Sequence, residues 1–497
     1  MGALEIIKDT ALTTHQKIVA LAKEAENSLH VLNISNEVQA LRDEGVICDL
    51  FEGNAPYRPR YILPDYDLFM KKGCEFLRLT PPNDIWEAVN NLLIIYKHVP
   101  SITTMPVYLG NLDYLLEPFV ENEDEARKAI KFLLVHLDRT ITDSFCHGNI
   151  GPRVTKAGKL ILEIERVLED SVPNLTLKYG AETSDEFALE SIKTALKVAK
   201  PSFANHEMFL KDLGEGYGIA SCYNGLYISG GAFTLVRMVL SKLVKRSNSM
   251  ENFLNEVLPN AVNLMADYMD ERIRFIMEET SFFETSFLSK EGFISKDKFT
   301  GMFGVVGLAE CVNLLLNATD LSERFGHNKK ADELGVKIIE RIVRVLNSRD
   351  NPYCNVTKGK FLLHAQVGIS DDIGVSPGCR IPIGEEPGLR DHILQAGLFH
   401  PYFPSGIGDI FPFDETTSRN PEYILDIIKG AFKCNMRYFS IYEQNADVVR
   451  ITGYLVKKSD MEKLKKGDQV LHDTVALGLG ACEGGRMLER KVRNDKG

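Results

Sequence analysis

The sequence predicts an α/β fold in which many helices surround a central sheet or barrel. Helix-like and strand-like stretches alternate along the 497 residues, 44% of the residues are hydrophobic, and charges of both signs are mixed through the chain. This composition supports a sizeable core and argues against a disordered chain. The length suits about three domains of ordinary size or one large barrel with additions.

The expected helices carry apolar residues at the three- and four-residue spacing of an amphipathic helix. Residues 185–200 begin with acidic side chains, which helix N-termini favour. Residues 248–279 predict one or two long helices, with a kink or a break at Pro259. Residues 299–317 predict a glycine-rich loop that turns into an apolar helix, and residues 331–349 predict a further amphipathic helix.

The expected strands are short runs rich in β-branched and aromatic residues. They cover residues 158–165, 359–367, 436–443 and 447–457. Between residues 367 and 417 the chain is rich in Gly, Pro and Asp, which predicts a long loop. A loop of that length inside a compact domain is usually functional or poorly ordered.

Composition and motifs narrow the possible functions. The net charge is −11 and no long basic run occurs, so we expect no nucleic-acid partner. No apolar run reaches the length of a membrane helix and the N-terminus lacks signal-peptide features, so we expect a cytoplasmic protein with no membrane partner. Phosphate-loop, dinucleotide-binding, metalloprotease and serine-hydrolase motifs are missing. The nine cysteines form no CxxC pair, so we expect mostly reduced, buried thiols and no metal site.

One cysteine stands in an unusual setting. Cys222 lies in the run "GYGIASCYNGLYISGGAFTLVRM" (residues 216–238), where small residues surround it and apolar residues flank it. This pattern predicts a tight loop that carries one thiol, follows a strand and leads into a helix. From composition alone, a buried and inert cysteine is the competing interpretation.

Two stretches of the chain resemble the reactive loops of the glycyl radical enzymes. "YGIASC" followed by "YISGGAFTLVR" is similar to their cysteine finger loop, and "VRITGYLV" is similar to their C-terminal radical loop. In the second stretch Arg450, Gly453 and Tyr454 match the family pattern, and Ile451 replaces a valine. The order of the two motifs also fits, and the chain length resembles the compact YjjI-type subgroup over its whole extent.

The resemblance implies a fold and a domain division. Family members contain a ten-stranded α/β barrel, built from two antiparallel five-stranded half-barrels and surrounded by helices. We therefore expect residues 1–424 to form the barrel with a helical N-terminal region and the cysteine finger loop. Residues 425–497 are expected to form a C-terminal glycyl radical domain, and we expect the protein to be a homodimer.

The resemblance also implies a chemistry. A radical stored on Gly453 takes a hydrogen atom from Cys222 under anaerobic conditions, and the thiyl radical then abstracts hydrogen from a small-molecule substrate. Arg450 and Tyr454 would support the radical loop. A radical needs a closed interior, and the loop's apolar flanks are consistent with burial: Val448, Val449, Ile451, Leu455 and Val456.

No bound cofactor is expected in this chain. The resemblance implies that a separate radical S-adenosylmethionine activase with an iron–sulfur cluster installs the radical after translation, because this chain lacks the clustered cysteines that would hold such a cluster. Access to Gly453 would require the C-terminal segment to open. The polar residues 457–469 would suit a surface hinge or docking face, and a plain solvated helix is the competing interpretation.

The chain departs from its better-known relatives in ways that leave the reaction open. Ser221 stands where the pyruvate formate-lyases have a second cysteine, and Asn224 stands where dehydratases have a glutamate base. Residues 299–315 resemble a segment of the anaerobic ribonucleotide reductases, but the paired cysteines of their zinc site are missing. Three alternatives stay open: a ribonucleotide-reductase-like activity, a formate-lyase-like or acyltransferase-like activity, and a non-catalytic spare-part partner of a larger radical enzyme.

Six further residues are candidates for the substrate pocket. Cys146 and His147 could supply a second thiol or a proton donor, or form a turn with a packed cysteine. His364, on an expected strand, could equally be a core histidine, and Cys379 could line a substrate entrance or an exposed loop. The full set is Tyr223, Asn224, Cys146, His147, His364 and Cys379.

Overall fold

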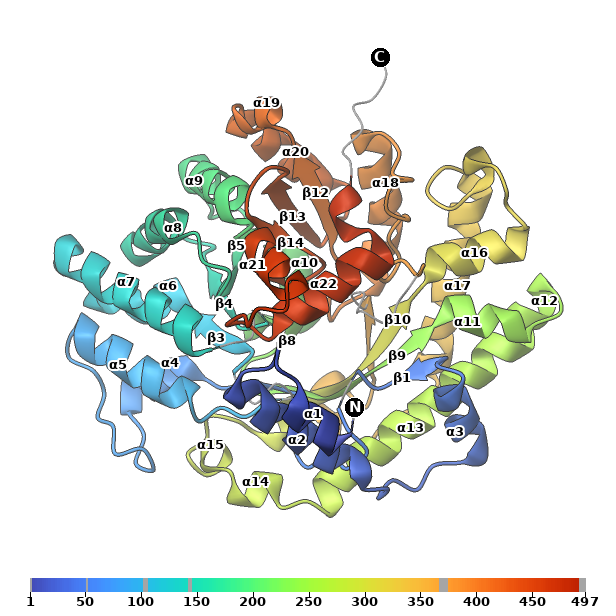
Figure 1. Ribbon diagram of the computed structural model, residues 1–497, viewed down its shortest axis with the longest axis horizontal. Coiled ribbons are helices and arrows are strands. Elements are labelled where there is room, and N and C mark those ends of the chain that lie inside the picture. The colour runs from blue at the N-terminus through green and yellow to red at the C-terminus, as the bar shows by residue number, and fades with distance from the viewer. Residues whose placement is uncertain (1, 51, 102–105, 142–144, 366–373, 491–497) are drawn as a thin grey trace.

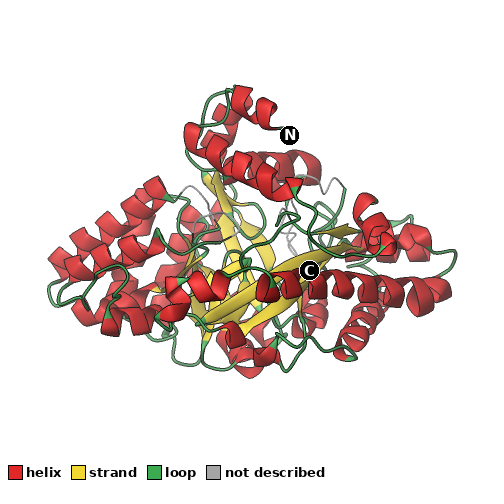
Figure 2. Cartoon of the chain, turned by 90° about the horizontal axis from the view of Figure 1, so that it is seen from below, coloured by secondary structure: helices red, strands yellow, loops and turns green. Residues whose placement is uncertain are grey.

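The computed structural model describes residues 2–50, 52–101, 106–141, 145–365 and 374–490. Helices form an outer layer around strands that gather at the centre of the molecule (Figures 1 and 2). Across these described ranges, no helix combines the length and the apolar character needed to span a membrane.

The N-terminal region is largely helical, and its first two helices lie side by side in the lower half of Figure 1. Two short strands follow its first helices, and both pair antiparallel with β9 (Gly230–Val239). The elements of this region are α1 (Ala3–Lys8), α2 (Thr14–Ser28), α3 (Asn36–Asp43), β1 (Ile47–Cys48), β2 (Tyr61–Leu63), α4 (Tyr66–Lys72) and α5 (Ile85–Tyr96).

The first half-barrel consists of β2 and four mutually parallel strands, the first of which contacts β2. These strands are almost entirely buried, which is typical of parallel strands covered on both faces. They are β3 (Tyr108–Asn111), β4 (His147–Ile150), β5 (Asn174–Tyr179) and β6 (Ser202–Asn205).

The second half-barrel begins with β9, which pairs in parallel with β10, and β10 pairs in parallel with β11. Its last two strands are parallel to each other. The strands after β9 are β10 (Phe299–Val306), β11 (Leu362–Ala365), β12 (Asp409–Phe413) and β13 (Tyr438–Glu443).

The two halves meet antiparallel at both junctions. β13 pairs antiparallel with β6, and β9 pairs antiparallel with β2. Within the second half, β11 is joined to the chain before β12 by a hydrogen bond from the amide of Ala365 to the carbonyl of Gly406, at 3.0 Å. The described strands therefore follow the order of two antiparallel five-stranded half-barrels, which confirms the predicted fold class.

Amphipathic helices connect consecutive strands and cover the outside of the barrel. In α17 the buried positions Leu334, Ile338 and Ile342 recur every four residues, so one face packs inward. The helices of this layer are α6 (Leu112–Leu116), α7 (Glu123–Thr140), α8 (Lys156–Leu168), α9 (Asp185–Val198), α10 (His206–Leu213), α11 (Leu240–Leu243), α12 (Met250–Asn252), α13 (Leu258–Glu278), α14 (Phe282–Thr285), α15 (Phe287–Lys290), α16 (Leu308–Leu316), α17 (Lys329–Asn347), α18 (Leu389–Phe399), α19 (Glu415–Ser418) and α20 (Pro421–Lys433).

The predicted helices over 185–200 and 331–349 are confirmed by α9 and α17. The long stretch with Pro259 forms α12 and α13, separated by a π-helical turn at Phe253–Val257. Pro259 follows that π-helical turn within a continuous helix, so the irregular turn lies where the proline has no N–H to donate.

Two predictions of local structure are wrong. Residues 158–165 form part of α8 rather than a strand, because the Thr155 side chain caps the helix and its buried apolar residues follow helical spacing. The glycines in residues 299–306 belong to strand β10, not to a loop. A Cβ on Gly304 would come within 2.9 Å of the Val236 carbonyl oxygen on the neighbouring strand, so close strand contact explains this glycine.

The expected long loop over 367–417 contains α18 and β12 in its second half, so the loop prediction is wrong there. Its first residues, up to 373, lie outside the described part of the chain. The burial of Ile393 and Phe399 along α18 shows that this glycine- and proline-rich stretch still supplies a helix face to the core.

Two hairpins stand apart from the barrel sheets. The first joins β7 (Tyr217–Ala220) to β8 (Asn224–Tyr227), so Cys222 is followed by strands and not by the predicted helix. The second joins β14 (Val448–Arg450) to β15 (Leu455–Lys457), which divides the predicted strand over 447–457 into two. The chain then forms α21 (Lys458–Lys465) and α22 (Thr474–Gly485), shown in red near the middle of Figure 1.

Candidate active site

Cys222 lies at the tip of the β7–β8 hairpin, which we call the finger hairpin (residues 217–227). Its three-residue turn places Ser221 in the left-handed region with φ 58°. The Asn149 side chain on β4 bonds both the N–H and the carbonyl of Ile219, at 2.8 Å each. The finger hairpin is therefore fixed to the barrel wall just before its tip.

His147 fixes the tip itself. Its Nδ1 lies 2.7 Å from the Ser221 carbonyl oxygen and must donate, because a carbonyl can only accept. Its Nε2 then accepts from the Thr176 hydroxyl at 2.7 Å. Burial lowers the pKa of His147 to about 3, so the ring is neutral. The structure places His147 as a support of the thiol loop, with both ring nitrogens already engaged.

Gly453 lies at the tip of the β14–β15 hairpin, which we call the radical hairpin (residues 448–457). Gly453 and the five predicted apolar flanks are all buried. Arg490 reinforces the turn, donating from Nη1 to the Arg450 carbonyl at 3.1 Å and from Nη2 to the Ile451 carbonyl. The hairpin tip is thus closed off from solvent, as a stored radical requires.

The two tips touch. A Cβ built on Gly453 would overlap the Cys222 side chain and would lie only 2.9 Å from the Cys222 Cα. The α-hydrogen of Gly453 that a side chain would replace therefore points at the thiol-bearing group. No other residue type fits here, and the reason is this close approach.

Asn174, at the start of β5, connects the two hairpins. Its Nδ2 donates to the Gly453 carbonyl oxygen at 3.1 Å and lies 3.5 Å from the Ser221 carbonyl oxygen. Its Oδ1 accepts from Nη2 of Arg450 at 3.0 Å, and Nη1 of Arg450 lies 3.4 Å from the Gly453 carbonyl oxygen. The carbonyl that would share a Gly453 radical is therefore polarised by an amide and a guanidinium.

The Cys222 thiol is held in its neutral form. Burial raises its pKa to about 12, although the Ser221 hydroxyl and the charges of Arg450 and Arg380 act in the opposite direction. The Ser221 Oγ lies 3.8 Å from the sulfur. A protonated thiol carries the hydrogen atom that a carbon radical could abstract, which fits the expected relay.

Tyr454 completes the radical hairpin on its outer side. Its ring packs on Phe145 with 4.9 Å between centroids, and burial raises the pKa of its phenol well above the ordinary value. The Tyr454 hydroxyl is buried, and no described residue forms a hydrogen bond with it. Its contribution to the tip is apolar packing.

Three of the predicted pocket residues lie together beyond the thiol. The Tyr223 ring packs between His364 and Tyr438, with 5.6 Å to each centroid, and its hydroxyl donates to the Ala365 carbonyl at 2.8 Å. Burial lowers the pKa of His364 to about 3 and raises that of Cys379 well above its ordinary value. His364 and Cys379 are therefore both neutral here.

Cys146 and Asn224, the two remaining predicted pocket residues, do not pack against Tyr223 and His364. Cys146 directly precedes β4, and its side chain points to the opposite side of the sheet from that of His147. It lies close enough to Tyr66 and Tyr96 for its thiolate charge to raise the pKa of both phenols. Asn224 begins β8, and both polar atoms of its side-chain amide are buried with no hydrogen-bond partner in the described part of the chain. Asn224 is therefore free to bond a ligand, whereas Cys146 is not brought to the thiol.

Sequence reasoning missed most of the polar groups that hold the two tips. They come from elements distant in the chain, and none belongs to either recognised loop. No signal in the sequence indicated them, because all but Tyr438 lie outside the predicted strands. The missed residues are Asn149, Asn174, Thr176, Arg380, Tyr438 and Arg490.

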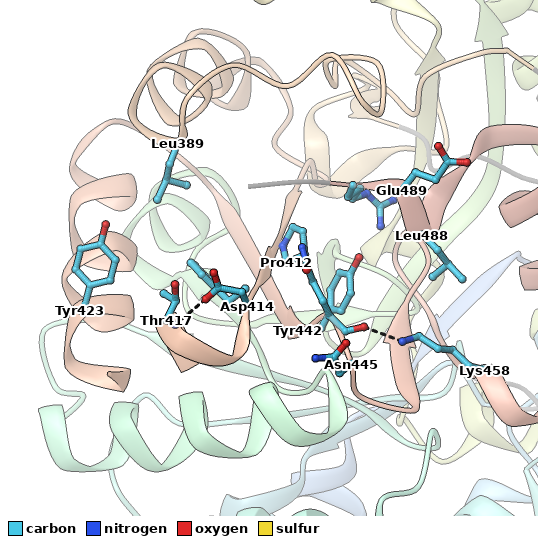
Figure 3. Close-up of a pocket in the computed structure, with 13 residues that line it drawn as sticks. Leu389, Pro412, Asp414, Thr417, Tyr423, Tyr442, Asn445, Lys458, Leu488 and Glu489 are labelled. Atoms are coloured by element: carbon cyan, nitrogen blue, oxygen red, sulfur yellow. Dashed lines mark hydrogen bonds between the residues drawn. The ribbon is translucent and has the colours of Figure 1, made fainter. Parts of the chain in front are cut away.

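A separate cleft of about 540 Å³ lies behind the radical hairpin (Figure 3). Its lining joins the barrel residues Pro412 and Tyr442 to Lys458 and Glu489 of the C-terminal segment. Lys458 Nζ donates to the Gln444 carbonyl at 2.7 Å across this region. The cleft marks the boundary between the barrel and residues 444–490, which we call the C-terminal unit.

Comparison with known proteins identifies relatives over nearly the whole chain. A family described as glycyl radical enzyme YjjI-like matches residues 12–493. A Haemophilus influenzae protein is 47% identical over 99% of this chain and 97% of its own length. The Escherichia coli protein YjjI is 42% identical over 98% of this chain and 95% of its own length. Neither relative's name states an activity.

Solved structures share the fold at low sequence identity. The anaerobic ribonucleotide reductase of Thermotoga maritima, in complex with dATP and CTP, matches with a TM-score of 0.71 and 12% identity, over 93% of this chain and 92% of that chain. The B12-independent glycerol dehydratase of Clostridium butyricum, with glycerol bound, matches with a TM-score of 0.66 and 12% identity, over 94% and 83%. At these identities the likeness concerns the fold.

Family match and fold together define this chain as a glycyl radical enzyme. The class carries its radical on a glycine of the folded protein, introduced after translation. Within the class, the chain belongs to the YjjI-like family. The family predicted from the loops around Cys222 and Gly453 is thereby confirmed over the length of the chain.

Proposed function

We propose that Gly453 stores the radical and that Cys222 passes it to a small-molecule substrate. The observation that carries this proposal is the contact between the two hairpin tips, where a side chain on Gly453 would overlap Cys222. The neutral state of the thiol supports the same assignment, because burial raises its pKa to about 12. Arg450 and Tyr454 hold the radical hairpin in place.

The proposed steps transfer single hydrogen atoms. The Gly453 Cα radical takes the hydrogen of the Cys222 S–H bond, which restores a Cα–H bond and leaves a sulfur radical. The sulfur radical then takes a hydrogen from a C–H bond of the substrate, which restores the S–H bond and leaves a carbon radical on the substrate. Each step forms one bond and breaks one, so no ion or external reductant takes part.

A separate activase is proposed to generate the radical. Gly453 is buried, so a radical S-adenosylmethionine enzyme with an iron–sulfur cluster would need the C-terminal unit to swing out. The cleft along Tyr442, Lys458 and Glu489 supports this, because it separates the unit from the barrel. The predicted C-terminal domain begins at residue 425 and would include β13. Because β13 pairs with β12 on one side and β6 on the other, it belongs to the barrel, and we propose that the moving part begins at residue 444. The homodimer and the cytoplasmic location stay predictions.

Electron paramagnetic resonance tests the radical assignment. The protein is incubated with its activase, S-adenosylmethionine and a reductant in the absence of oxygen. We expect a doublet spectrum from coupling to the remaining α-hydrogen of Gly453, and its loss in Gly453→Ala. A doublet of equal intensity in Gly453→Ala, or no organic radical after verified activase turnover, would refute the assignment.

A non-catalytic spare-part role is the alternative outside enzymology. The buried Cys222 and the supports that His147 and Asn149 give its hairpin favour an enzyme, because a spare part needs only the radical hairpin. Cys222→Ser separates the two: an enzyme keeps the radical doublet and loses turnover, whereas a spare-part protein keeps both the radical and the rescue of its partner.

A further inference from the structure

Arg380 places a buried guanidinium close to Tyr223, the residue that follows Cys222. Only 8% of the residue is exposed. Its Nε donates a hydrogen bond to the Gly408 carbonyl at 2.7 Å. Its Cζ lies 5.9 Å from the centre of the Tyr223 ring. Nη1 and Nη2 are both buried, and neither has a hydrogen-bond partner among the residues that the structure describes. One edge of the guanidinium is fixed, and the other is unoccupied.

The acidic residues around Arg380 are engaged elsewhere. Asp409 accepts from His392 at 3.3 Å and from His400 at 3.0 Å. Glu385 forms an ion pair with Arg324 at 2.5 Å, and Glu386 accepts from the Gly384 amide at 2.7 Å. Within the described ranges of the chain, Arg380 therefore has no carboxylate as an ion-pair partner.

A second guanidinium near the thiol is also uncompensated. Arg450 is fully buried and bonds the Ala199 carbonyl at 2.7 Å and the Asn174 amide oxygen at 3.0 Å, and among the described ion pairs it has none. Burial lowers the pKa of Arg450 to about 10, and the charge of Arg380 acts in the same direction. Arg380 and Arg450 are therefore two buried cations near the thiol that form no direct ion pair with a described residue.

A buried guanidinium without a direct counter-ion destabilises the fold, and proteins keep one where a ligand supplies the opposite charge. The two unoccupied amino groups of a guanidinium form a fork that matches two oxygens of one oxyanion. Asn224, two residues from Cys222 and with both amide atoms unoccupied, offers a further donor and acceptor.

We propose that the substrate carries an oxyanion, a carboxylate or a phosphate, which binds Nη1 and Nη2 of Arg380. This assignment rests on the proposed radical chemistry for the position of the reacting carbon, which would lie between Arg380 and the Cys222 sulfur. Asn224 would bond a neighbouring hydroxyl, carbonyl or amine of the same molecule. The proposal concerns the substrate class and predicts that neutral polyols bind poorly.

The test uses the full-length, unactivated protein, so it does not depend on radical formation. Thermal unfolding is measured with glycolate, succinate, inorganic phosphate and glycerol phosphate, and with neutral glycerol, at constant ionic strength set by chloride. We expect the midpoint to rise by at least about 1 °C with one or more of the oxyanions and not with glycerol. The carboxylate and phosphate arms show which oxyanion is preferred.

Three variants assign the effect to Arg380. Arg380→Gln should abolish the oxyanion-dependent rise, and Arg380→Lys should weaken the apparent affinity by about tenfold because it keeps the charge without the fork. Arg419→Gln removes an arginine with 76% of its side chain exposed and should behave as the wild type. Without ligand, Arg380→Gln should unfold at the same temperature as the wild type or at a higher one, because it removes an uncompensated buried charge.

Several outcomes would overturn the proposal. The first is an unfolding midpoint that no oxyanion raises, and the second is an equal rise with glycerol. The third is a rise with an oxyanion that persists in Arg380→Gln. The fourth is a lower unfolding temperature of ligand-free Arg380→Gln, which would show that the guanidinium stabilises the fold. A radical doublet with no oxyanion response refutes this inference alone. Oxyanion binding without a doublet refutes the radical assignment alone.

Discussion

At the residue scale, Gly453 is a glycine because of what lies beside it. Its φ is not in the positive region that favours glycine, so backbone conformation does not explain the choice. The Cys222 side chain occupies the place of a Cβ, and this leaves one α-hydrogen directed at the thiol. The same contact excludes every larger residue and brings the two proposed hydrogen donors together.

The protonation of Cys222 gives a first prediction. Its pKa of about 12 lies above the usual value for cysteine, roughly 8.5, so at pH 8 the thiolate should be scarcer than in the unfolded chain by a factor of about 10³. Alkylation by iodoacetamide, followed by mass spectrometry, should be slower by at least that factor and should rise about tenfold per pH unit. Equal rates for folded and urea-unfolded protein at pH 8 would contradict this.

Asn174 gives a second prediction. Asn174→Ala removes the donor 3.1 Å from the Gly453 carbonyl and leaves Nη2 of Arg450 with one acceptor fewer. We expect docking of the radical hairpin to weaken by about 1–3 kcal/mol, because buried polar groups lose their partners. Hydrogen exchange of residues 448–457 should accelerate, and the radical yield should fall. Asn445→Ala, at an exposed position in the cleft, is the matched control and should change neither.

At the element scale, the C-terminal unit is fastened to the barrel near α7. His472 Nε2 lies 2.9 Å from the Asp138 carbonyl oxygen and 3.4 Å from its carboxylate. Burial alone would lower the pKa of His472, but its bond to Asp138 and that carboxylate's charge raise it overall. Burial would raise the pKa of Asp138, and the bond and charge from His472 lower it instead. The two groups therefore stabilise each other's charged forms.

This pair predicts how the attachment depends on pH. The contribution of His472 is fully present below the pKa of an unfolded histidine, about 6.5, and is lost as the pH rises through the higher folded value. The contribution of Asp138 is present above about 3.9 and is lost as the pH falls further. Limited proteolysis within residues 466–473 should therefore become faster from pH 6 to pH 9.

His472→Ala is the decisive variant for this attachment. It should be cleaved quickly at every pH, because a charge-assisted hydrogen bond of about 1–3 kcal/mol is missing. Lys463→Ala, which removes an exposed ion pair with Asp460 on α21, should keep the pH dependence of the wild type. A flat wild-type profile would contradict the role of the His472–Asp138 pair.

At the scale of the whole molecule, the sequence was sufficient for the fold class, and it marked the two loops that carry Cys222 and Gly453, whose tips the structure brings together. Helices with clear amphipathic spacing, such as α17, were predicted correctly. Short apolar runs were ambiguous: residues 158–165 read as a strand but form a helix, because spacing over eight residues fits both. The supports of the tips, such as Asn174 and Arg490, could not be predicted, because barrel closure alone brings them to residues distant in the chain.

The division between barrel and C-terminal unit gives the last prediction. Air exposure of the activated protein should cleave the backbone at Gly453 and release a C-terminal fragment, detectable by mass spectrometry. The barrel should stay folded with a cooperative unfolding transition, because its sheets end with β13 at Glu443. A protein that keeps an intact chain after the radical signal has decayed in air would contradict this, and the unactivated protein is the control.

The position of the radical hairpin after β13 also bears on how the molecule is assembled during translation. Every barrel strand is complete at Glu443, so the N-terminal part can fold while residues 448–490 are still being synthesised. The finger hairpin can therefore form before the radical hairpin, which follows it in the chain, covers it. We expect a chain truncated before Val448 to fold as a barrel that lacks the radical hairpin and leaves the tip of the finger hairpin uncovered.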